Sequence, residues 1–423
     1  MDADAFIELL NKNKNDTIKN KYKINNQKNE ENKQKEKKKG FIELNYIQPT
    51  LIGLDNIGAT CFMNSTLQCL SQTEGLSNYF LNPKNKNKII NNNIAIVNIN
   101  DHQLSPFFLE LIENLWNKQN SKKSFSPYNI INKINEMNSL FKKGQPGDSK
   151  DFIIFILEQL HKELKKSVNK NNSLANETAL NQYDKTNAFN HFFTEFQKDC
   201  SIISDIFFGF IETTNECLNC KNIYNNQGLM NPICYNYQIF NCIIFPLEEV
   251  KNMKNNLMQN NNIMPFNNNI VSIYECFYYN QKSDFFTGEN RNYCNICKQL
   301  YDSIYTNKIF VGPNILVLIL NRGKDNIYNV KLDFSETIDI SQFIIQKEMP
   351  QIIYNLYGVI THIGQSGPNA HFVASCKSPV DKRWYRYNDS VVSQINDVQK
   401  EIIDFGTPYI LFYQKNNNIN NIP

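Results

Sequence analysis

The chain has 423 residues, 41% hydrophobic and 20% charged, which is enough for one large domain or two ordinary ones with a packed core. The net charge of +3 is uneven: residues 11–40 carry eleven lysines against four acids, or +7, so the remainder carries 33 basic and 37 acidic groups, or −4. A nucleic-acid-binding protein normally presents a basic face. The acidic remainder therefore argues against a nucleic-acid partner.

Membrane insertion and export are also not expected. The apolar run Ile315–Leu320 is far too short to cross a bilayer, and the first residues are acidic where a secretory signal carries positive charge. We therefore expect an intracellular protein, cytoplasmic or nuclear, and the cluster Lys35–Lys39 is a candidate nuclear-import signal. Disulfides are rare in such a reducing compartment, so the eleven cysteines indicate metal binding, a nucleophile or buried packing.

Low-complexity segments interrupt the chain. Nineteen of the thirty residues from 11 to 40 are Asn or Lys, and such a segment buries too little apolar surface to offset its ordering entropy. We predict a disordered tail over residues 1–45, a folded domain over 46–416 and a second disordered tail over 417–423. Asn is again frequent at 252–269, nine of eighteen residues, which indicates a surface insertion within the fold.

Apolar periodicity predicts helices first and strands later. One helix follows Thr60 as its N-cap and places Met63, Leu67 and Leu70 on one face. A second helix begins after Asp148. The later half contains short apolar stretches bounded by Gly, Pro, Asn and Asp, which are typical of strands: Ile315–Leu320, Tyr354–Ile363, His371–Lys377, Arg383–Asn388 and Tyr409–Gln414. This order indicates an α+β fold.

The segment GLDNIGATCFMNSTLQ, from Gly53 to Gln68, contains a candidate nucleophile. Cys61 falls in the first turn of the predicted helix, where unpaired amides and the positive end of the helix dipole favour a thiolate. Asn56, five residues earlier, could donate its amide to the oxygen that gains charge when the thiolate attacks a carbonyl. The alternative is that Cys61 is a buried packing residue and that Asn56 caps a turn.

A thiolate nucleophile needs a base, and the chain has five histidines. His371 opens a predicted strand after the loop GQSGPN, a position that can present an imidazole at the rim of a cleft. Seventeen residues later, Asn388 and Asp389 stand at the end of another predicted strand. If the two strands are adjacent, Asn388 can fix the orientation and tautomer of the imidazole. Spacing alone leaves a purely structural histidine equally open.

Two CxxC pairs form a candidate metal site. The ligands are Cys217 and Cys220 in ECLNCK, and Cys294 and Cys297 in YCNICK, with 73 residues between the pairs. Two such pairs complete a tetrahedral zinc site, and four sulfur ligands leave no position for water, so we predict one structural zinc ion per chain. Reduced cysteines without a metal are the alternative. Packing roles are predicted for the other six cysteines: Cys69, Cys200, Cys234, Cys242, Cys276 and Cys376.

These motifs together resemble one family. GLDNIGATCFMNSTLQ resembles the Cys box of the ubiquitin-specific proteases, and THIGQSGPNAHFVASCKSPVDKRWYRYNDS resembles their His box. FKKGQPGDSKDFIIFILEQLHKEL is similar to the helix that follows a Gln-Gln-Asp signature in this family, and PYILFYQK is similar to the closing strand. The resemblance runs from Gly53 to Lys415 in consistent order.

The resemblance implies a papain-like cysteine peptidase of thumb, palm and fingers: a helical thumb, an antiparallel palm sheet and β fingers, over roughly residues 205–305, with zinc at their tip. It implies a deubiquitinating thiol hydrolase that cleaves the isopeptide or peptide bond after the C-terminal glycine of ubiquitin. The partners would be ubiquitin and ubiquitinated proteins. We expect a monomer.

The same resemblance assigns roles to individual residues. It implies Cys61 as the nucleophile, His371 as the general base and Asn388 as the group that orients the base. Asn56 would donate to the oxyanion, and Asp389 would support or replace Asn388. Asparagine in the third position can accept the imidazole N–H without adding a buried charge.

The sequence departs from the family pattern next to the second helix. The usual Gln-Gln-Asp is Pro146-Gly147-Asp148, and the acid three residues later is Asp151 where glutamate is usual. In the family this turn helps to hold the basic C-terminal tail of ubiquitin, so Asp148 is expected to bind substrate without its usual neighbours. The altered turn leaves one alternative open, a ubiquitin-binding pseudoenzyme with little turnover.

Overall fold

The computed structural model describes most of the chain from residue 50 onward. The described ranges are 50–90, 103–117, 122–166, 179–260, 269–323, 329–347, 349–364 and 370–416. They belong to one unit, Gln48–Pro423. The predicted tails 1–45 and 417–423, with Lys35–Lys39, lie outside these ranges, as do residues 261–268 of the Asn-rich segment. Within the ranges, no helix combines the length and the apolar character that a membrane span requires.

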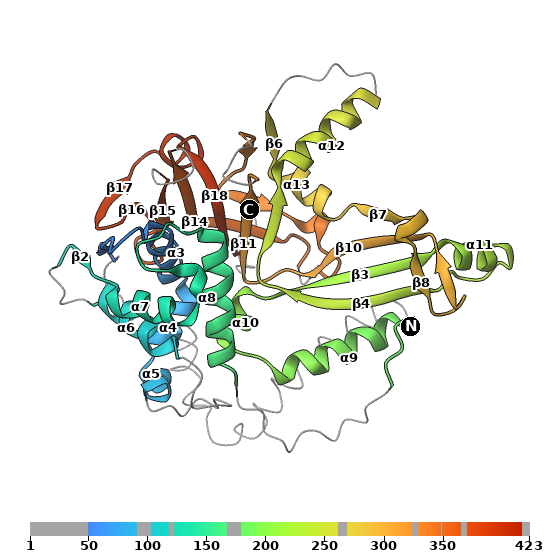
Figure 1. The fold of residues 1–423 in the computed structure, drawn as a ribbon, viewed down its shortest axis with the longest axis horizontal. Coiled ribbons are helices and arrows are strands. Elements are labelled where there is room, and N and C mark those ends of the chain that lie inside the picture. The colour runs from blue at the N-terminus through green and yellow to red at the C-terminus, as the bar shows by residue number, and fades with distance from the viewer. Residues whose placement is uncertain are drawn as a thin grey trace, which may run out of the picture. The chain divides into compact units, whose positions relative to one another are not determined.

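Apart from α9, Lys185–Lys198, which packs elsewhere, the helices of residues 61–207 are grouped along one side of the larger sheet (Figure 1). Their bounds are α3 Cys61–Ser71, α4 Glu74–Leu81, α5 Pro83–Ile90, α6 Ser105–Leu115, α7 Tyr128–Met137, α8 Ser149–Glu163 and α10 Ile202–Phe207. The two predicted helices are α3 and α8. All eleven residues of α3 are buried, because this helix lies between α8 and strands of the sheet. The apolar face predicted for α3 is therefore one part of a contact surface that surrounds the whole helix.

The larger sheet has eight strands, and neighbours follow the order β17-β16-β15-β14-β18-β11-β5, with β13 also paired to β14. Their bounds are β5 Ile243–Pro246, β11 Ile315–Asn321, β13 Thr337–Asp339, β14 Ile353–Ile363, β15 His371–Lys377, β16 Trp384–Asn388, β17 Val391–Ile395 and β18 Thr407–Lys415. All five predicted strands are in this sheet. Its pairs are antiparallel except that β5 runs parallel to β11. The α+β class is confirmed.

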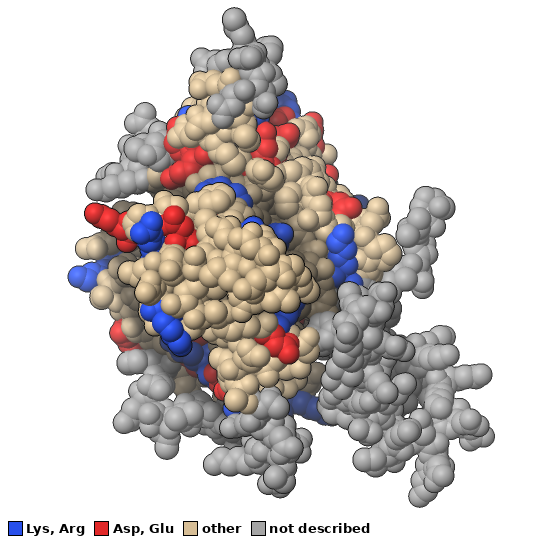
Figure 2. Space-filling view, turned by 90° about the vertical axis from the view of Figure 1, so that its right-hand side faces the viewer, with Lys and Arg blue, Asp and Glu red and all other residues tan. Residues whose placement is uncertain are grey.

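A second sheet of four strands, in the order β4-β3-β10-β7, projects away from the first (Figure 1). Its strands are β3 Gly209–Cys217, β4 Ile233–Phe240, β7 Ser283–Phe286 and β10 Ser303–Val311. At its far end lie helix α11 Leu218–Asn226 and the short hairpin of β8 Asn292–Cys294 with β9 Gln299–Tyr301. Figure 2 views the molecule from this end, where the surface is mostly uncharged with scattered charges around it. This sheet is in the position of the fingers.

The predicted fingers range, 205–305, contains elements of both sheets. Strand β5 joins the larger sheet, and the elements after it are α12 Leu247–Asn260, β6 Ile270–Ser272 and α13 Ile273–Asn280. Phe245, Val250 and Phe277 are buried in the same core as the larger sheet. Residues 252–260 of the Asn-rich segment continue α12 as a helix, because Leu247 and Val250 anchor its first turns in that core. The fingers sheet is therefore built from two separate stretches, 209–240 and 283–311.

Candidate active site

A sharp turn precedes Cys61, the first residue of α3. Gly58 has φ of 121°, in the region that favours glycine, and Ala59 has φ of 53°. The side-chain oxygen of Asn56 accepts hydrogen bonds from the backbone N–H groups of Gly58 at 3.2 Å and Thr60 at 3.1 Å. Thr60 occupies the N-cap position, but its side chain does not cap α3; the hydroxyl instead accepts from the N–H of Ile57. Asn56 therefore stabilises the turn that delivers Cys61 to the helix start.

His371 joins two of the predicted catalytic residues. It begins β15, which pairs with β16, and its Nε2 lies 2.6 Å from Oδ1 of Asn388 at the end of that strand. Cys61 also interacts with this ring. Because Nε2 faces Asn388, we assign Nδ1 to Cys61. The interaction with Cys61, opposed by burial and helped by the bond to Asn388, raises the pKa of His371 to about 9.

Asp389 connects the end of β16 to the loop before Cys61. Its carboxylate accepts from the side-chain amide of Asn56 at 3.0 Å and from that of Asn64 on α3 at 2.8 Å. Its backbone has φ of 48°, and its carbonyl accepts from the N–H of Leu54 at 2.9 Å. A Cβ on Gly53 would lie 2.5 Å from that carbonyl, so only glycine allows this approach. The Asp389 carboxylate faces Asn56 and Asn64, and the hydrogen bond to the imidazole belongs to Asn388.

These contacts orient the amide of Asn56 at both ends. Its oxygen accepts from the turn, and one of its two N–H groups donates to Asp389. An asparagine amide has a second N–H. The side chain is exposed, so this group can meet a substrate oxygen beside Cys61. Sequence reasoning did not identify Asn64, which lies outside the apolar face predicted for α3.

Asp148 links the first turn of α8 to the end of β18. One carboxylate oxygen accepts from the N–H of Lys150 at 2.9 Å, so Asp148 caps the start of α8. The other accepts from the hydroxyl of Tyr409 at 2.7 Å. Burial and the neighbouring Asp148 hold the pKa of Tyr409 well above its usual range. His362 is buried beside Tyr409, and burial lowers the pKa of that imidazole. Tyr409 was also missed by sequence reasoning.

Gly147, where the family has glutamine, packs directly on Phe62. A Cβ at this position would lie 2.5 Å from Cζ of the Phe62 ring, closer than real contacts allow. Ser149 donates its hydroxyl to the backbone oxygen of Phe62 at 3.2 Å. The altered turn is therefore fitted to the residue that follows Cys61.

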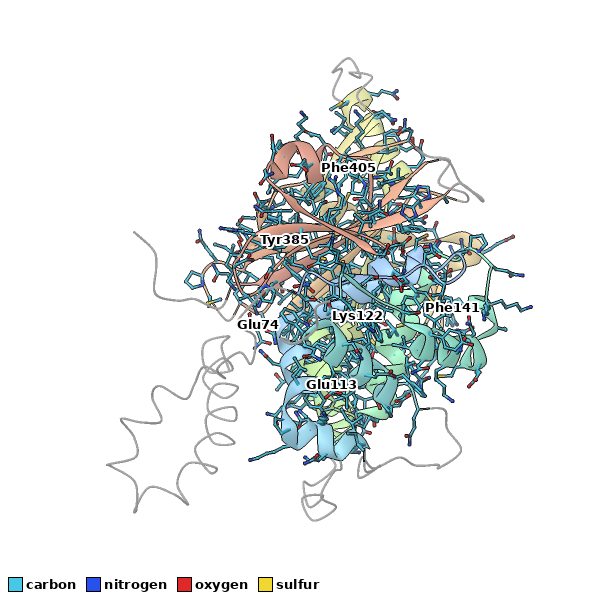
Figure 3. The ribbon with its side chains drawn as sticks, turned by 90° about the vertical axis from the view of Figure 1, so that its left-hand side faces the viewer. Glu74, Glu113, Lys122, Phe141, Tyr385 and Phe405 are labelled. Atoms are coloured by element: carbon cyan, nitrogen blue, oxygen red, sulfur yellow. The ribbon has the colours of Figure 1, made fainter. Side chains whose placement is uncertain are left out.

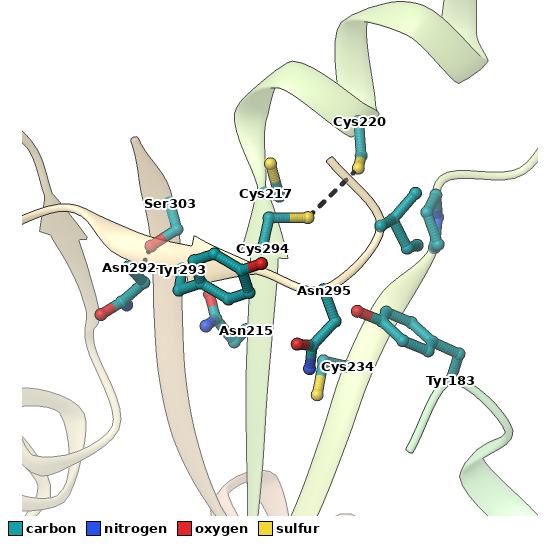
Figure 4. A pocket seen from close by; sticks show the side chains of 12 residues that line it. Tyr183, Asn215, Cys217, Cys220, Cys234, Asn292, Tyr293, Cys294, Asn295 and Ser303 are labelled. Atoms are coloured by element: carbon teal, nitrogen blue, oxygen red, sulfur yellow. Dashed lines mark hydrogen bonds between the residues drawn. The ribbon is translucent and has the colours of Figure 1, made fainter. Parts of the chain in front are cut away.

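The four cysteines of the CxxC pairs meet at the end of the fingers, and Figure 4 shows Cys217, Cys220 and Cys294 of this set. Cys217 ends β3, and its backbone pairs with Ser303 on β10, which brings the hairpin of β8 and β9 beside it. The four sulfur atoms lie within 4.8 Å of one another, with Cys220 at 3.6 Å from Cys294 and 3.3 Å from Cys297. Sulfurs bound tetrahedrally at about 2.3 Å from zinc are roughly 3.8 Å apart, whereas a disulfide is about 2.05 Å long. The cluster fits a tetrahedral metal ion.

Hydrogen bonds around the cluster suit thiolate ligands. The side-chain amide of Asn219 donates to Sγ of Cys297 at 3.3 Å, and the N–H of Cys297 donates to Sγ of Cys294 at 3.4 Å. Such donors reduce the charge on metal-bound sulfur and orient it. Cys234 lines the adjoining cavity but is outside the set of four.

The sequence model of the family described as "Ubiquitin carboxyl-terminal hydrolase" matches residues 52–413. The chain belongs to this family. The resemblance to ubiquitin-specific proteases is thereby confirmed, over a range that includes every predicted catalytic and metal-binding residue.

Curated relatives are similar over most of this chain. Ubiquitin carboxyl-terminal hydrolase 2 of Bos taurus is 26% identical over 371 residues, which are 86% of this chain and 55% of that protein. Ubiquitin carboxyl-terminal hydrolase Usp2 of Drosophila melanogaster is 23% identical over 372 residues, 86% of this chain and 35% of that protein. The chain thus spans between about a third and about a half of these two relatives.

Among solved structures, the chain is similar to one described as "Structure of the SAGA Ubp8/Sgf11/Sus1/Sgf73 DUB module bound to ubiquitin aldehyde". The TM-score is 0.60 and the identity 21%, with 90% of this chain and 72% of that chain covered. At this identity the comparison establishes the fold. The thumb, palm and fingers architecture is therefore confirmed.

Proposed function

We propose that this protein is a thiol-dependent deubiquitinase, which cleaves the isopeptide or peptide bond after the C-terminal glycine of ubiquitin. The observation that carries the proposal is the imidazole of His371, whose Nε2 lies 2.6 Å from Oδ1 of Asn388 and whose pKa is raised chiefly by its interaction with Cys61. Nucleophile, base and orienting group are then in the order that a Cys-His-Asn site requires. Relatives named ubiquitin carboxyl-terminal hydrolases support the substrate class.

The reaction follows from the positions of these groups. His371 takes the proton of Cys61, and the thiolate attacks the glycine carbonyl. The free N–H of Asn56 stabilises the negative oxygen, and His371 then gives its proton to the leaving amine. Water, deprotonated by His371, attacks the thioester and releases the ubiquitin carboxylate and the Cys61 thiol. Asp389 positions Asn56 throughout.

We also propose that Cys217, Cys220, Cys294 and Cys297 bind one structural zinc ion per chain. The ion would stabilise the end of the fingers. The four cysteines take no part in the reaction, because the catalytic residues lie at the start of α3 and on the larger sheet. Asp148 is proposed to bind the basic tail of ubiquitin while it remains hydrogen-bonded to Tyr409.

Ubiquitin with a C-terminal electrophile tests the nucleophile, and a fluorogenic ubiquitin amide tests turnover. We expect a covalent adduct that maps to Cys61. We expect Cys61→Ala to lower amide hydrolysis by at least about a thousandfold, because the nucleophile is lost. Cys200→Ala, which removes a half-buried thiol on another element, is the matched control and should behave like the parent.

Two results would contradict the proposal. An adduct on another residue would reject Cys61 as the nucleophile. Tight ubiquitin binding by the parent without amide hydrolysis would instead identify the pseudoenzyme that the altered Pro146-Gly147 turn leaves open.

A further inference from the structure

A cluster of lysines next to the active site contrasts with the acidic charge of the rest of the protein. Residues 122–150 contain six lysines and two acids, a net +4, whereas the whole chain outside residues 11–40 carries −4. Three of these lysines, all exposed, form what we call the basic rim: Lys123, Lys142 and Lys143.

Lys123, which forms the first half of the basic rim, is linked to Asp389 by backbone hydrogen bonds that pass through strand β1, Gly53–Leu54. The carbonyl of Lys123 accepts from the N–H of Gly53 at 3.0 Å, at the start of β2, Ser124–Phe125. The next residue, Leu54, donates its N–H to the carbonyl of Asp389 at 2.9 Å. Lys123 is therefore separated from the turn after Asn388 by a single short strand.

The second half lies against the loop that precedes Cys61. A Cβ on Gly58 would lie 3.6 Å from Cα of Gly144, so the chain following Lys143 touches the nucleophile loop. The ammonium of Lys143 lies 5.4 Å from the ring centroid of Tyr128, a partner that leaves its charge uncompensated. Figure 3 shows Lys122 and Phe141, which directly precede the two halves of the basic rim, on the helical part of the molecule.

The charge of the basic rim is available for a partner. Across the described ranges, no carboxylate forms an ion pair with Lys123, Lys142 or Lys143. The nearby carboxylate of Asp389 already accepts from two amides. Asp55 is the other acid in the nucleophile loop, so positive charge remains in excess at this rim.

The order of strands in the larger sheet places Asp148 and Asp389 at opposite ends of the cleft. Asp148 binds Tyr409 on β18, His371 lies two strands away on β15, and Asp389 follows β16 beyond it. If the basic tail of ubiquitin lies along Asp148, as the proposed function states, the leaving amine departs toward Asp389 and the adjoining Lys123 of the basic rim.

We propose that the basic rim binds acidic residues next to the ubiquitin-bearing lysine of the substrate protein. The inference rests on the proposed function and adds a preference for the leaving group. Exposed ion pairs contribute little each and are screened by salt. The preference therefore concerns binding of the substrate, and it appears in KM at low ionic strength while kcat is unchanged.

The test uses two ubiquitin–peptide conjugates joined through a lysine side chain, one flanked by four glutamates and the other by four glutamines. At low salt we expect the glutamate conjugate to have a KM about fivefold lower, and we expect the difference to disappear at about 0.5 M salt. The variant Lys123→Ser/Lys142→Ser/Lys143→Ser should lose this preference. Its matched control, Lys251→Ser/Lys254→Ser/Lys282→Ser, removes three lysines that form ion pairs outside residues 122–150 and should keep it.

The outcomes separate this inference from the proposed function. If the parent hydrolyses neither conjugate nor the fluorogenic amide, the proposed function fails. If it hydrolyses the amide but cleaves both conjugates equally at low salt, only the basic rim inference fails. Micromolar binding of a single-stranded oligonucleotide that is lost in the rim variant would assign the lysines to nucleic acid and overturn the inference as well.

Discussion

The protein has two cysteine sites that begin in the same way and end differently. Cys61 is the first residue of α3, and Cys217 directly precedes α11, so both sulfurs stand at the N-terminus of a helix. The helix dipole favours a thiolate at each. Cys61 faces the imidazole of His371, whereas Cys217 faces three further sulfurs. The neighbours, rather than the helix end, separate a nucleophile from a metal ligand.

The two sites are also held together differently. The cleft joins segments far apart in the chain, as in the bond from Asn56 to Asp389 across 333 positions. The cysteine cluster depends on two local turns, brought together by the register of β3 with β10. Damage to the cluster should therefore affect folding of the fingers, and damage to the cleft should affect chemistry.

Removing a sulfur from the cluster should have the largest effect on stability. Cys220→Ser takes away the sulfur closest to two others, and we expect about 3 kcal/mol or more of stability to be lost, together with the bound metal. Denaturant unfolding and metal analysis of the purified protein measure both. Cys234→Ser, which removes a thiol from the adjoining cavity, is the control and should keep one zinc per chain. A Cys220→Ser protein with the metal content and stability of the parent would falsify the structural zinc site.

Introducing the usual glutamine of the family at position 147 should damage the cleft. We expect Gly147→Gln and Gly147→Ala each to cost about 1–3 kcal/mol, because a Cβ would collide with the Phe62 ring. Since Phe62 follows Cys61, amide hydrolysis should fall as well. Gly75→Ala, in helix α4, is the matched control. The added Cβ would lie 3.3 Å from Cδ1 of Ile206, so this change should be close to neutral.

A second variant shows whether Phe62 is the cause. In Phe62→Leu the six-membered ring is gone, so the penalty of Gly147→Ala should shrink when both changes are combined. Equal penalties in the two backgrounds would mean that the turn is sensitive for another reason.

The sequence predicted the elements of the cleft better than their connections. Helices α3 and α8 and the five strands of the larger sheet appeared within a few residues of their bounds, because apolar periodicity and turn residues define them locally. The pairing of Asn64 with Asp389, 325 positions away, had no local signal. It depends on tertiary packing of α3 against the sheet, which also buries the polar face of that helix.

The fingers show the same limit. The CxxC spacing predicted the four cysteines that the structure brings together. It did not reveal that the chain leaves the fingers after β4 and adds β5 parallel to β11 in the other sheet. Parallel pairing requires a long connection, and Asn-rich composition hid the helix α12 that forms part of it.

The cleft, unlike the cysteine cluster, contains a histidine whose protonation should make the stability of the protein depend on pH. The pKa of His371, about 9 in the folded protein, lies above the usual 6.5, so the charged imidazole stabilises the fold. This contribution is fully present below pH 6.5 and is lost as the pH rises through 9. The difference in unfolding free energy between the parent and His371→Gln should therefore shrink over that range.

NMR titration of the histidine ring protons separates the causes of this shift. The interaction with Cys61 is the largest cause, so Cys61→Ala should lower the pKa of His371 more than Asn388→Ala does. His161, whose pKa is lowered by burial beside α10, should titrate unchanged in both variants and serves as the internal control. If His371 titrated near 6.5 in the parent, Cys61 and Asn388 would not stabilise the charged imidazole, and the stability difference between the parent and His371→Gln would not change between pH 6.5 and 9.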